Sequence, residues 1–580
     1  MGGSVVVLTR RSSRCWLALA AGGCLLAWTI SAQSFNVLYT FSGVEGAADG
    51  GNPSNLTLAT NGMFYGTCVN DGFQGWGDIF QISAAGALMP MYSFTNLDPV
   101  PYDGSYPYAA LTQGTNGLLY GLAQSGGSNG TGTIFKVTTN GAFTSLYAFS
   151  PLVTQRGHGT PLSTNADGAV PKYALVLDTN DGNFYGTTDQ GGTNSYGTLF
   201  QLTHAGKLTV LYAFSNSVDG ASPRAPLLVY TNGDLYGTTF YGGSNGSGAV
   251  FRATAAGQVT ALYSFTNGID GANPEAALID GKDGNLYGVC SAGGSNGTGS
   301  IYKITTNGVL TPLYSFSAGS SSFSGQYNVD GINPNSLLLG SDGNFYGTAQ
   351  FGTASGDGCI FEITPANAFS LLYAFTYDED GGPNSDGAYP VSLLQYSDGK
   401  LCGTAIGGGA NSAGTFFTLG LPPAITSQPT NQSIALYGNA SFSLTATGSP
   451  TCQWQFDGAD ISNATNYTLA ITNAQIADAG SYQAILTSTN GGTESSVVTL
   501  SITNVPATLP STAGSLLYGN GQFSMVVTNL TGQGAVVIEA SSDLVQWTPI
   551  YTNASGFGAA PFIDSTAGNY AVRFYRATAP

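Results

Sequence analysis

One motif, repeated seven times, constrains this chain more than any other feature of its sequence. Each copy opens with Asp-Gly and has a proline four residues after the Asp. It continues with an Asn-Gly or Asp-Gly pair and, in six of the seven copies, a Tyr-Gly pair, and most copies end with a segment of the Leu-Tyr-x-Phe type. A repeat of about 40–50 residues that contains several short strands is typical of a β-propeller blade. The seven opening aspartates are Asp49, Asp103, Asp167, Asp219, Asp270, Asp330 and Asp386.

Each copy can be divided into four strands. Small apolar residues after the proline, such as 109–111, predict an inner strand that is buried on both faces. The following Asn-Gly or Asp-Gly pair predicts a two-residue type I′ turn, which needs positive φ at both central residues. Segments such as 64–67, 134–137 and 146–149 supply the second, third and fourth strands. Four antiparallel strands then make one blade.

The two ends of the array predict how it closes. Copy seven stops at 415–419 without a fourth strand, and one spare strand of that type, 38–41, precedes the first opening. We therefore expect the N-terminal strand to complete the last blade, which removes two exposed sheet edges. The predicted fold is all-β: a seven-bladed β-propeller at 35–420 with N-terminal strand closure.

Two further domains are predicted after a proline-containing linker. Gln453-Trp454-Gln455 and the segment 478–482 resemble an immunoglobulin domain of the intermediate-set type at about 424–503. The resemblance implies that Trp454 is the buried strand-C tryptophan and Tyr482 the tyrosine corner. Ala484 stands where the family has a cysteine, so this core would rest on packing alone. Alternating segments at 507–580 predict a small C-terminal β-sandwich module.

The array itself resembles the bacterial GloVer-type tandem repeats, a family known for its "choice-of-anchor" C-termini. The resemblance covers 35–420 and rests on all seven Asp-Gly-x-x-Pro openings and on six of seven Tyr-Gly pairs, with Cys402 in place of the seventh tyrosine. It implies no particular function.

The N-terminus and the charge of the chain indicate a compartment. Three arginines precede an apolar run from Trp16 to Ile30, which predicts a secretory signal peptide at 1–33 and a secreted, extracellular or cell-surface protein. A membrane anchor would need about 20 apolar residues, and a lipid anchor at Cys24 is the other alternative. A net charge of −18 argues against nucleic acid or anionic lipid as a partner. No later stretch is apolar enough to cross a membrane.

Chemical motifs are scarce. The two histidines, His158 and His204, occupy no repeated position, and no recognised hydrolase, metalloprotease or nucleotide-binding motif occurs. Five cysteines remain after the signal peptide, with no metal-binding spacing. Whether Cys359 and Cys402, in neighbouring blades, form a disulfide stays open. We expect a protein that is not an enzyme and holds no cofactor.

Length variation concentrates on the rim that carries the openings, and variable loops on a rigid scaffold are where binding usually occurs. Acidic residues beside aromatic faces suit sugar recognition, so we predict a ligand site made of the seven opening aspartates with Trp76, Tyr106 and Tyr241. A repeated Asp before Gly can instead cap its own turn. If the carboxylates converged, calcium would relieve their repulsion.

Three functions are compatible with these features. The first is a secreted or cell-surface binding and adhesion protein whose partner is an extracellular polysaccharide or a cell-surface protein. The second is a carbohydrate-active enzyme, which would need a non-repeated carboxylate pair in the channel, and glutamates are few in the array: Glu45, Glu275, Glu362 and Glu379. The third is a purely structural component of the cell envelope.

Overall fold

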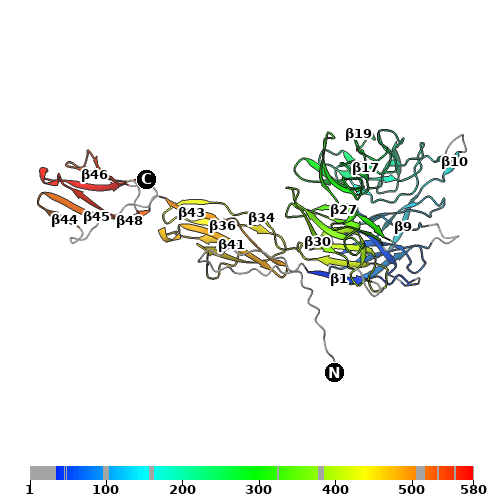
Figure 1. The fold of residues 1–580 in the computed structure, drawn as a ribbon, viewed down its shortest axis with the longest axis horizontal. Helices are drawn as coiled ribbons and strands as arrows, with labels where there is room; N and C mark the ends of the chain where they lie inside the picture. Colours follow the sequence, from blue (N-terminus) through cyan, green and yellow to red (C-terminus); the bar gives the residue numbers. More distant parts are fainter. Residues whose placement is uncertain are drawn as a thin grey trace, which may run out of the picture.

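The computed structural model describes residues 34–44, 46–47, 49–95, 103–155, 162–322, 325–376, 384–503, 516–531, 535–553 and 557–578. The predicted signal peptide and His158 lie outside the described residues. Three bodies built of strands follow one another along the chain (Figure 1). The helices within the described part are two short 3₁₀ turns, η1 (Ile476–Asp478) and η2 (Ala567–Asn569), and none there has the length and apolarity needed to span a membrane.

The first body contains seven antiparallel sheets, one for each copy of the repeat. The first three sheets are β2 (Gly51–Leu58), β3 (Phe64–Asn70), β4 (Asp78–Ile82) and β5 (Leu88–Ser93); β6 (Thr112–Gln113), β7 (Leu119–Ala123), β8 (Thr133–Val137) and β9 (Phe143–Ala148); and β12 (Val176–Leu177), β13 (Phe184–Thr188), β14 (Thr198–Leu202) and β15 (Leu208–Ala213). The next two are β16 (Leu228–Val229), β17 (Leu235–Thr239), β18 (Ala249–Ala253) and β19 (Val259–Ser264); and β20 (Ala272–Pro274) with β21 (Ile279–Asp280), β22 (Asn285–Ala292), β23 (Ser300–Thr305) and β24 (Leu310–Ser315). The last two are β27 (Ile332–Leu339), β28 (Phe345–Phe351), β29 (Cys359–Ile363) and β30 (Phe369–Ala374); and β31 (Ala388–Gln395), β32 (Leu401–Gly407), β33 (Thr415–Leu419) and β1 (Phe35–Thr40).

The N-terminal strand β1 is the outer strand of the seventh sheet, as the sequence predicts. It pairs antiparallel with β33, from Phe35 opposite Leu419 to Thr40 opposite Thr415. Beyond the strand, Phe41 N–H donates to Gly414 O at 3.0 Å, and Phe94 of the first sheet makes the equivalent bond to Gly77 O. The two ends of the array therefore share one sheet.

Each sheet packs against the next, and the seventh packs against the first. Tyr65 of the first sheet shares a buried apolar cluster with Phe135 of the second, and every later junction repeats this arrangement. The cluster that joins the seventh sheet to the first contains Phe416 and Phe80. A backbone bond from Asn52 N–H to Ala413 O at 2.8 Å crosses the same junction. All five described cysteines are buried and free, including Cys359 and Cys402.

The inner hairpin turn differs from the predicted two-residue type I′ turn. In the first copy, Gly62 N–H donates to Ala59 O at 2.9 Å, and Ala59 N–H donates to Met63 O at 3.0 Å. Gly62 has φ +77°, whereas its neighbour Asn61 is not in the left-handed region. This pattern fits a three-residue loop that ends on a left-handed glycine. The glycine prediction was right, and the turn type was wrong because only one residue needs positive φ.

Two hairpins extend the connections between sheets. They are β10 (Val153–Gln155) with β11 (Leu162–Thr164), which projects at the right of Figure 1, and β25 (Ser320–Ser322) with β26 (Gly325–Tyr327).

The second body is an immunoglobulin-like arrangement with the expected core. Trp454 is fully buried and donates from Nε1 to Asn466 O at 2.9 Å, while the Tyr482 hydroxyl donates back to Asp478 O at 2.8 Å. Phe442 packs against both rings, and Ala484 is buried beside them. Its strands are β34 (Ile425–Ser427), β35 (Gln432–Ala435), β36 (Ala440–Ser443), β37 (Thr445–Ala446), β38 (Thr451–Phe456), β39 (Ala459–Asp460), β40 (Thr468–Ile471), β41 (Gly480–Ser488), β42 (Gly491–Glu494) and β43 (Val498–Thr503).

The third body consists of two three-stranded sheets that share the buried residues Met525, Val527, Ile538 and Phe562. Their strands are β44 (Leu516–Gly519), β45 (Gln522–Thr531) and β48 (Phe557–Asp564) in one sheet, and β47 (Thr548–Asn553), β46 (Val536–Ser541) and β49 (Phe574–Thr578) in the other.

Candidate functional site

The opening aspartates form the same contact in all seven copies. In each, the carboxylate accepts a hydrogen bond from the tyrosine hydroxyl of the preceding outer strand and from the backbone N–H that follows this strand. Tyr147 and Ser150 N–H, for example, donate to Asp167 at 2.7 and 3.0 Å. The seven tyrosine–aspartate pairs are Tyr39–Asp49, Tyr92–Asp103, Tyr147–Asp167, Tyr212–Asp219, Tyr263–Asp270, Tyr314–Asp330 and Tyr373–Asp386.

This contact, which we call the Tyr–Asp lock, ties each outer strand to the start of the next repeat. Six of the seven aspartates are buried, and Asp49 is half-buried. Burial, reinforced by the aspartate, raises the pKa of the partner tyrosine, to about 12 for Tyr263. The lock accounts for the sevenfold recurrence of Asp. A ligand role for these residues stays a prediction, and among the described residues no group of three or more His, Cys, Asp and Glu side chains is placed to hold a metal ion.

The three predicted aromatic residues separate into two places. Trp76 and Tyr106 pack edge to face, with ring centroids 5.7 Å apart, and Tyr106 N–H donates to Trp76 O at 3.0 Å. Tyr241 is 47% exposed and lies beside Arg224, whose guanidinium carbon is 5.3 Å from its ring centroid. Tyr241 alone among them is next to the charged cluster described below.

A cavity of about 450 Å³ lies where the inner strands of all seven copies meet. Its walls come from residues just after the opening prolines. In five copies the residue that directly follows the proline lines the cavity. These residues are Tyr108, Lys172, Glu275, Asn335 and Val391.

The inner strands are interrupted at this position, which explains why these side chains are available. The ladder shifts register after Pro53, Pro334 and Pro390. In the fifth copy β20 ends at Pro274 and pairing resumes only at Ile279. In copies two to four the inner strand begins several residues after the proline. Such interruptions re-aim a side chain away from regular sheet packing.

Sequence reasoning missed this position. It classed the residues after the proline as small and apolar, which does not hold for the first residue after the proline, nor for Asn55 and Tyr173 at the second. The signal was present: the residue directly after the proline is different in each of the seven copies, although the proline itself is constant. They are Ser54, Tyr108, Lys172, Arg224, Glu275, Asn335 and Val391.

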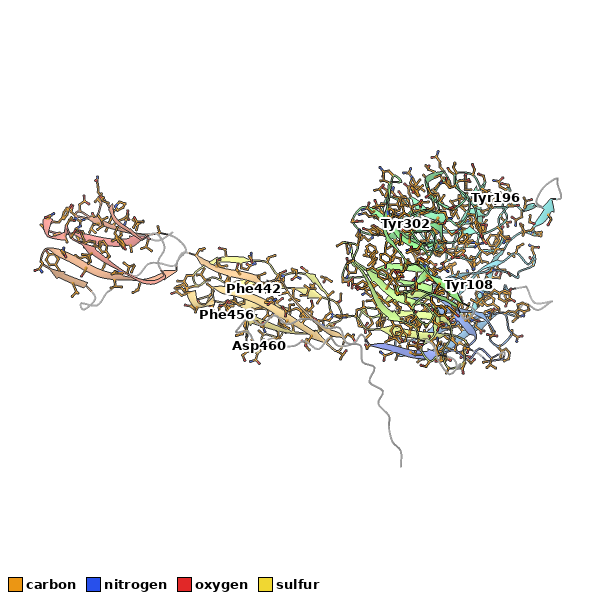
Figure 2. All side chains as sticks on the ribbon, viewed as in Figure 1. Tyr108, Tyr196, Tyr302, Phe442, Phe456 and Asp460 are labelled. Atoms are coloured by element: carbon orange, nitrogen blue, oxygen red, sulfur yellow. The ribbon has the colours of Figure 1, made fainter. Side chains whose placement is uncertain are left out.

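Charged and aromatic side chains from three copies gather at one side of the cavity. The ammonium of Lys172 lies 4.2 Å from the ring centroid of Tyr108 and 5.7 Å from that of Tyr173. Burial lowers the pKa of Lys172, and a contribution from Glu275 opposes this shift. Burial also raises the pKa of Glu275, while Lys172 and Arg224 lower it. Figure 2 shows Tyr108 within the repeat body.

Arg224 stands next to this group and is already paired. Its Nε donates to Asp189 Oδ1 at 3.1 Å, and its guanidinium lies 4.3 Å from the ring centroid of Phe240. Within the described residues, neither Lys172 nor Glu275 has an oppositely charged partner within 4.0 Å. The cavity therefore presents one ammonium and one carboxyl group that are free to contact a ligand.

Comparisons with known proteins match the repeat array and the immunoglobulin domain. A family model described as the Gloeobacter/Verrucomicrobia repeat matches residues 18–171 and 158–329. A model of the immunoglobulin I-set domain matches residues 423–502. Both resemblances predicted from the sequence are thereby confirmed.

Individual relatives match short parts of the chain. Endoglucanase C of Cellulomonas fimi is 34% identical over 86 residues, which are 14% of this chain and 8% of that protein. The match to the titin M3 domain is 23% identical, covers 14% of this chain and 95% of the titin chain, and gives a TM-score of 0.13. The tandem immunoglobulin repeats of Dlar are 16% identical, cover 20% of this chain and 66% of their own, and also give a TM-score of 0.13.

Proposed function

The chain belongs to the Gloeobacter/Verrucomicrobia repeat family, and from this premise we propose that it is a non-catalytic carbohydrate-binding protein of the cell surface or the extracellular space. The repeat and immunoglobulin families are compatible with that location. The observation that carries the proposal is the cavity, because repeats of one backbone place a different side chain after each proline, and five of these seven side chains line it.

The proposal includes a seven-bladed β-propeller as the scaffold. Support comes from the seven similar sheets, from the buried clusters at all seven junctions, and from the bond between Asn52 N–H and Ala413 O. In such a ring the inner strands surround a central channel, and the cavity lined by the residues after the prolines would be its mouth.

Carbohydrate is the ligand class that suits this lining. Ligand pockets of about 300–1,000 Å³ combine apolar walls with a few fixed polar groups. Here the phenol rings of Tyr108 and Tyr173 contribute apolar surface, Glu275 accepts from hydroxyls, and the Lys172 ammonium, which lies over the Tyr108 ring, supplies a charged donor. The short match to a protein named endoglucanase C adds weak support. A cell-surface protein is the alternative partner.

Binding without catalysis fits the carboxyl groups better than glycoside hydrolysis does. Hydrolases of glycosides generally use two carboxyl groups with separate roles. Asp189 is held by Arg224 at 3.1 Å, which leaves Glu275 as the unpaired carboxyl group in the cavity lining. The raised pKa of Glu275 favours the enzymatic alternative, since a general acid needs such a shift.

A glycan array probed with the mature full-length chain, with calcium and with chelator, tests the proposal. We expect selective binding that Tyr108→Ala abolishes and that Tyr518→Ala, an exposed change in the C-terminal body, leaves intact. Release of reducing ends from a bound glycan would establish the enzymatic alternative. A chain that folds and binds none of the glycans would favour the structural envelope component.

A further inference from the structure

The donors and acceptors in and beside the cavity do not balance. Lys172 offers three N–H groups, and its close partners among the described residues are the rings of Tyr108 and Tyr173. Arg224 uses its Nε for Asp189, and its two Nη groups donate no hydrogen bond to a described residue. On the acceptor side, Glu275 contributes one carboxyl group, and Asp189 contributes the carboxylate that already accepts from Arg224. Among the described residues, the N–H groups of Lys172 and the Nη groups of Arg224 therefore have no hydrogen-bond acceptor.

The two cations are near enough to affect one another. Burial is the main cause that lowers the pKa of Lys172; Glu275 raises this pKa, Arg224 lowers it by repulsion, and Asp189 raises it. Asp189 pairs with Arg224 at 3.1 Å, whereas no carboxylate of the described part of the chain lies within 4.0 Å of the Lys172 ammonium. A half-buried ammonium above an aromatic ring gains from the ring only part of what a direct anionic partner supplies.

From this arrangement we infer that the ligand is an acidic glycan. Its uronic-acid carboxylate binds the Lys172 ammonium on the side that faces Arg224, and its hydroxyls donate hydrogen bonds to Glu275. This inference rests on the proposed carbohydrate function and names the class of sugar. A carboxylate between Lys172 and Arg224 would accept hydrogen bonds from their unpaired N–H groups and would reduce the repulsion between the two cations. The carboxyl group of Glu275 keeps the selectivity from being purely electrostatic, since a bare anion without hydroxyls would leave it unpaired.

The chemistry also predicts what each side chain contributes. Lys172 should discriminate the carboxylate from the neutral sugar, because its ammonium meets only that group. Glu275 should act on hydroxyls that both sugars share. Removal of Lys172 and removal of Glu275 therefore have different signatures, even though both side chains line one cavity.

The test compares one oligosaccharide in two chemical forms. The mature full-length chain is titrated calorimetrically with trigalacturonide and with the same trisaccharide after reduction of its carboxyl groups. We expect the reduced form to bind at least tenfold more weakly. Lys172→Met should lower the affinity for trigalacturonide by at least tenfold and leave the affinity for the reduced form unchanged. Glu275→Gln should lower both affinities by similar factors.

Lys207→Met is the matched control, because Lys207 is an exposed lysine of the same array, and it should change neither affinity. Thermal melts check that each variant is folded. Equal binding of the two forms, or loss of both in Lys172→Met, would overturn the acidic-glycan inference while the carbohydrate function stands. Failure of the folded protein to bind either form, together with an unreactive glycan array, would overturn both.

Discussion

The Tyr–Asp lock shows how one side chain can recur seven times for structural reasons. In the fourth copy, Asp219 accepts from the Tyr212 hydroxyl at 3.1 Å, from Ser215 N–H at 2.8 Å and from Ser215 Oγ at 2.7 Å. A neutral amide at this position would keep one acceptor and turn an NH₂ group toward donors. Such a substitution should cost more stability than the loss of a simple turn cap, because it leaves buried hydrogen-bond donors unsatisfied.

We therefore predict that Asp219→Asn lowers the free energy of unfolding by about 1–3 kcal/mol. Urea denaturation of the full chain measures the free energy of unfolding. Its decrease in the variant should be the same in millimolar calcium and in chelator. Asp398→Asn, at a half-exposed turn aspartate, should cost about 0.5 kcal/mol or less. A loss confined to calcium-containing buffer would instead reveal a bound ion.

Asp78 is a buried acid where other copies have a small neutral residue. It is 2% exposed, and its Oδ2 has no hydrogen-bond partner. Three other copies have a threonine at this position, such as Thr133, whose hydroxyl donates to Asp103 O at 3.0 Å. Burial, with further contributions from the nearby Asp49 and Asp71, raises the pKa of Asp78 from 3.8 to about 7.

This shift predicts a pH-dependent stability. The folded chain retains a proton on Asp78 that the unfolded chain loses near pH 4. The contribution of this proton to the free energy of unfolding is therefore complete below pH 4 and is lost as the pH rises through about 7. Asp78→Thr should raise the free energy of unfolding at pH 8, by up to about 4 kcal/mol, and change it little at pH 4. Urea denaturation at both pH values measures it. Thr133→Asp should introduce the same pH dependence in the second sheet, and a pH-independent effect of either variant would contradict this account.

At the scale of elements, β1 determines whether the seventh sheet has an open edge. It pairs with β33, and Phe35 stacks on Tyr373 with ring centroids 3.8 Å apart. Other sheets take their outer strand from their own repeat, so only this one depends on a segment from the opposite end of the array. An unpaired edge there would be open to association with other chains.

Deletion of residues 35–41 should lower the melting temperature by on the order of 10 °C and cause aggregation. Differential scanning fluorimetry and light scattering measure the two effects. Removal of residues 153–164, which carry the β10–β11 hairpin, should leave both nearly unchanged, because no described strand outside the hairpin pairs with it. If the two deletions behaved alike, β1 would not be the element that closes the array.

At the scale of the whole molecule, the three bodies have separate cores. Figure 2 labels Phe442 and Phe456 in the immunoglobulin body, away from Tyr108 in the repeat body. A small polar contact joins these two bodies, in which Ser34 Oγ donates to Asn490 Oδ1 at 2.6 Å. The described buried clusters each belong to a single body. We expect the bodies to unfold in separate transitions.

Trp454→Ala should remove the immunoglobulin transition from a calorimetric scan, since deletion of a buried tryptophan costs about 3–5 kcal/mol. The transition of the repeat body should keep its temperature within about 2 °C, because roughly 1 kcal/mol corresponds to a few degrees in a domain of this size. Phe456→Leu, a milder change in the same core, should lower the immunoglobulin transition without removing it. A joint shift of both transitions would show that the bodies unfold together.

The features that the sequence alone determined are those set by neighbouring residues. Asp-Gly and Asn-Gly pairs specify where each hairpin turns, and strand patterns specify what lies between the turns, so the number of repeats and the outer strand supplied by β1 could be read in advance. Trp454 and Tyr482 were predictable for the same reason, since a known domain holds them at fixed spacing.

Only the tertiary structure decided which polar residues are structural and which face the cavity. The opening Asp was predicted at a ligand site because it recurs, yet recurrence here reflects a contact with the previous repeat through a tyrosine such as Tyr147. Lys172 and Glu275 lie far apart in the chain and line the same cavity because the inner strands are interrupted after the prolines and the seven sheets pack in succession. Turn chemistry is local, whereas the direction of a side chain at an interrupted strand depends on the packing of sheets that the local sequence does not encode.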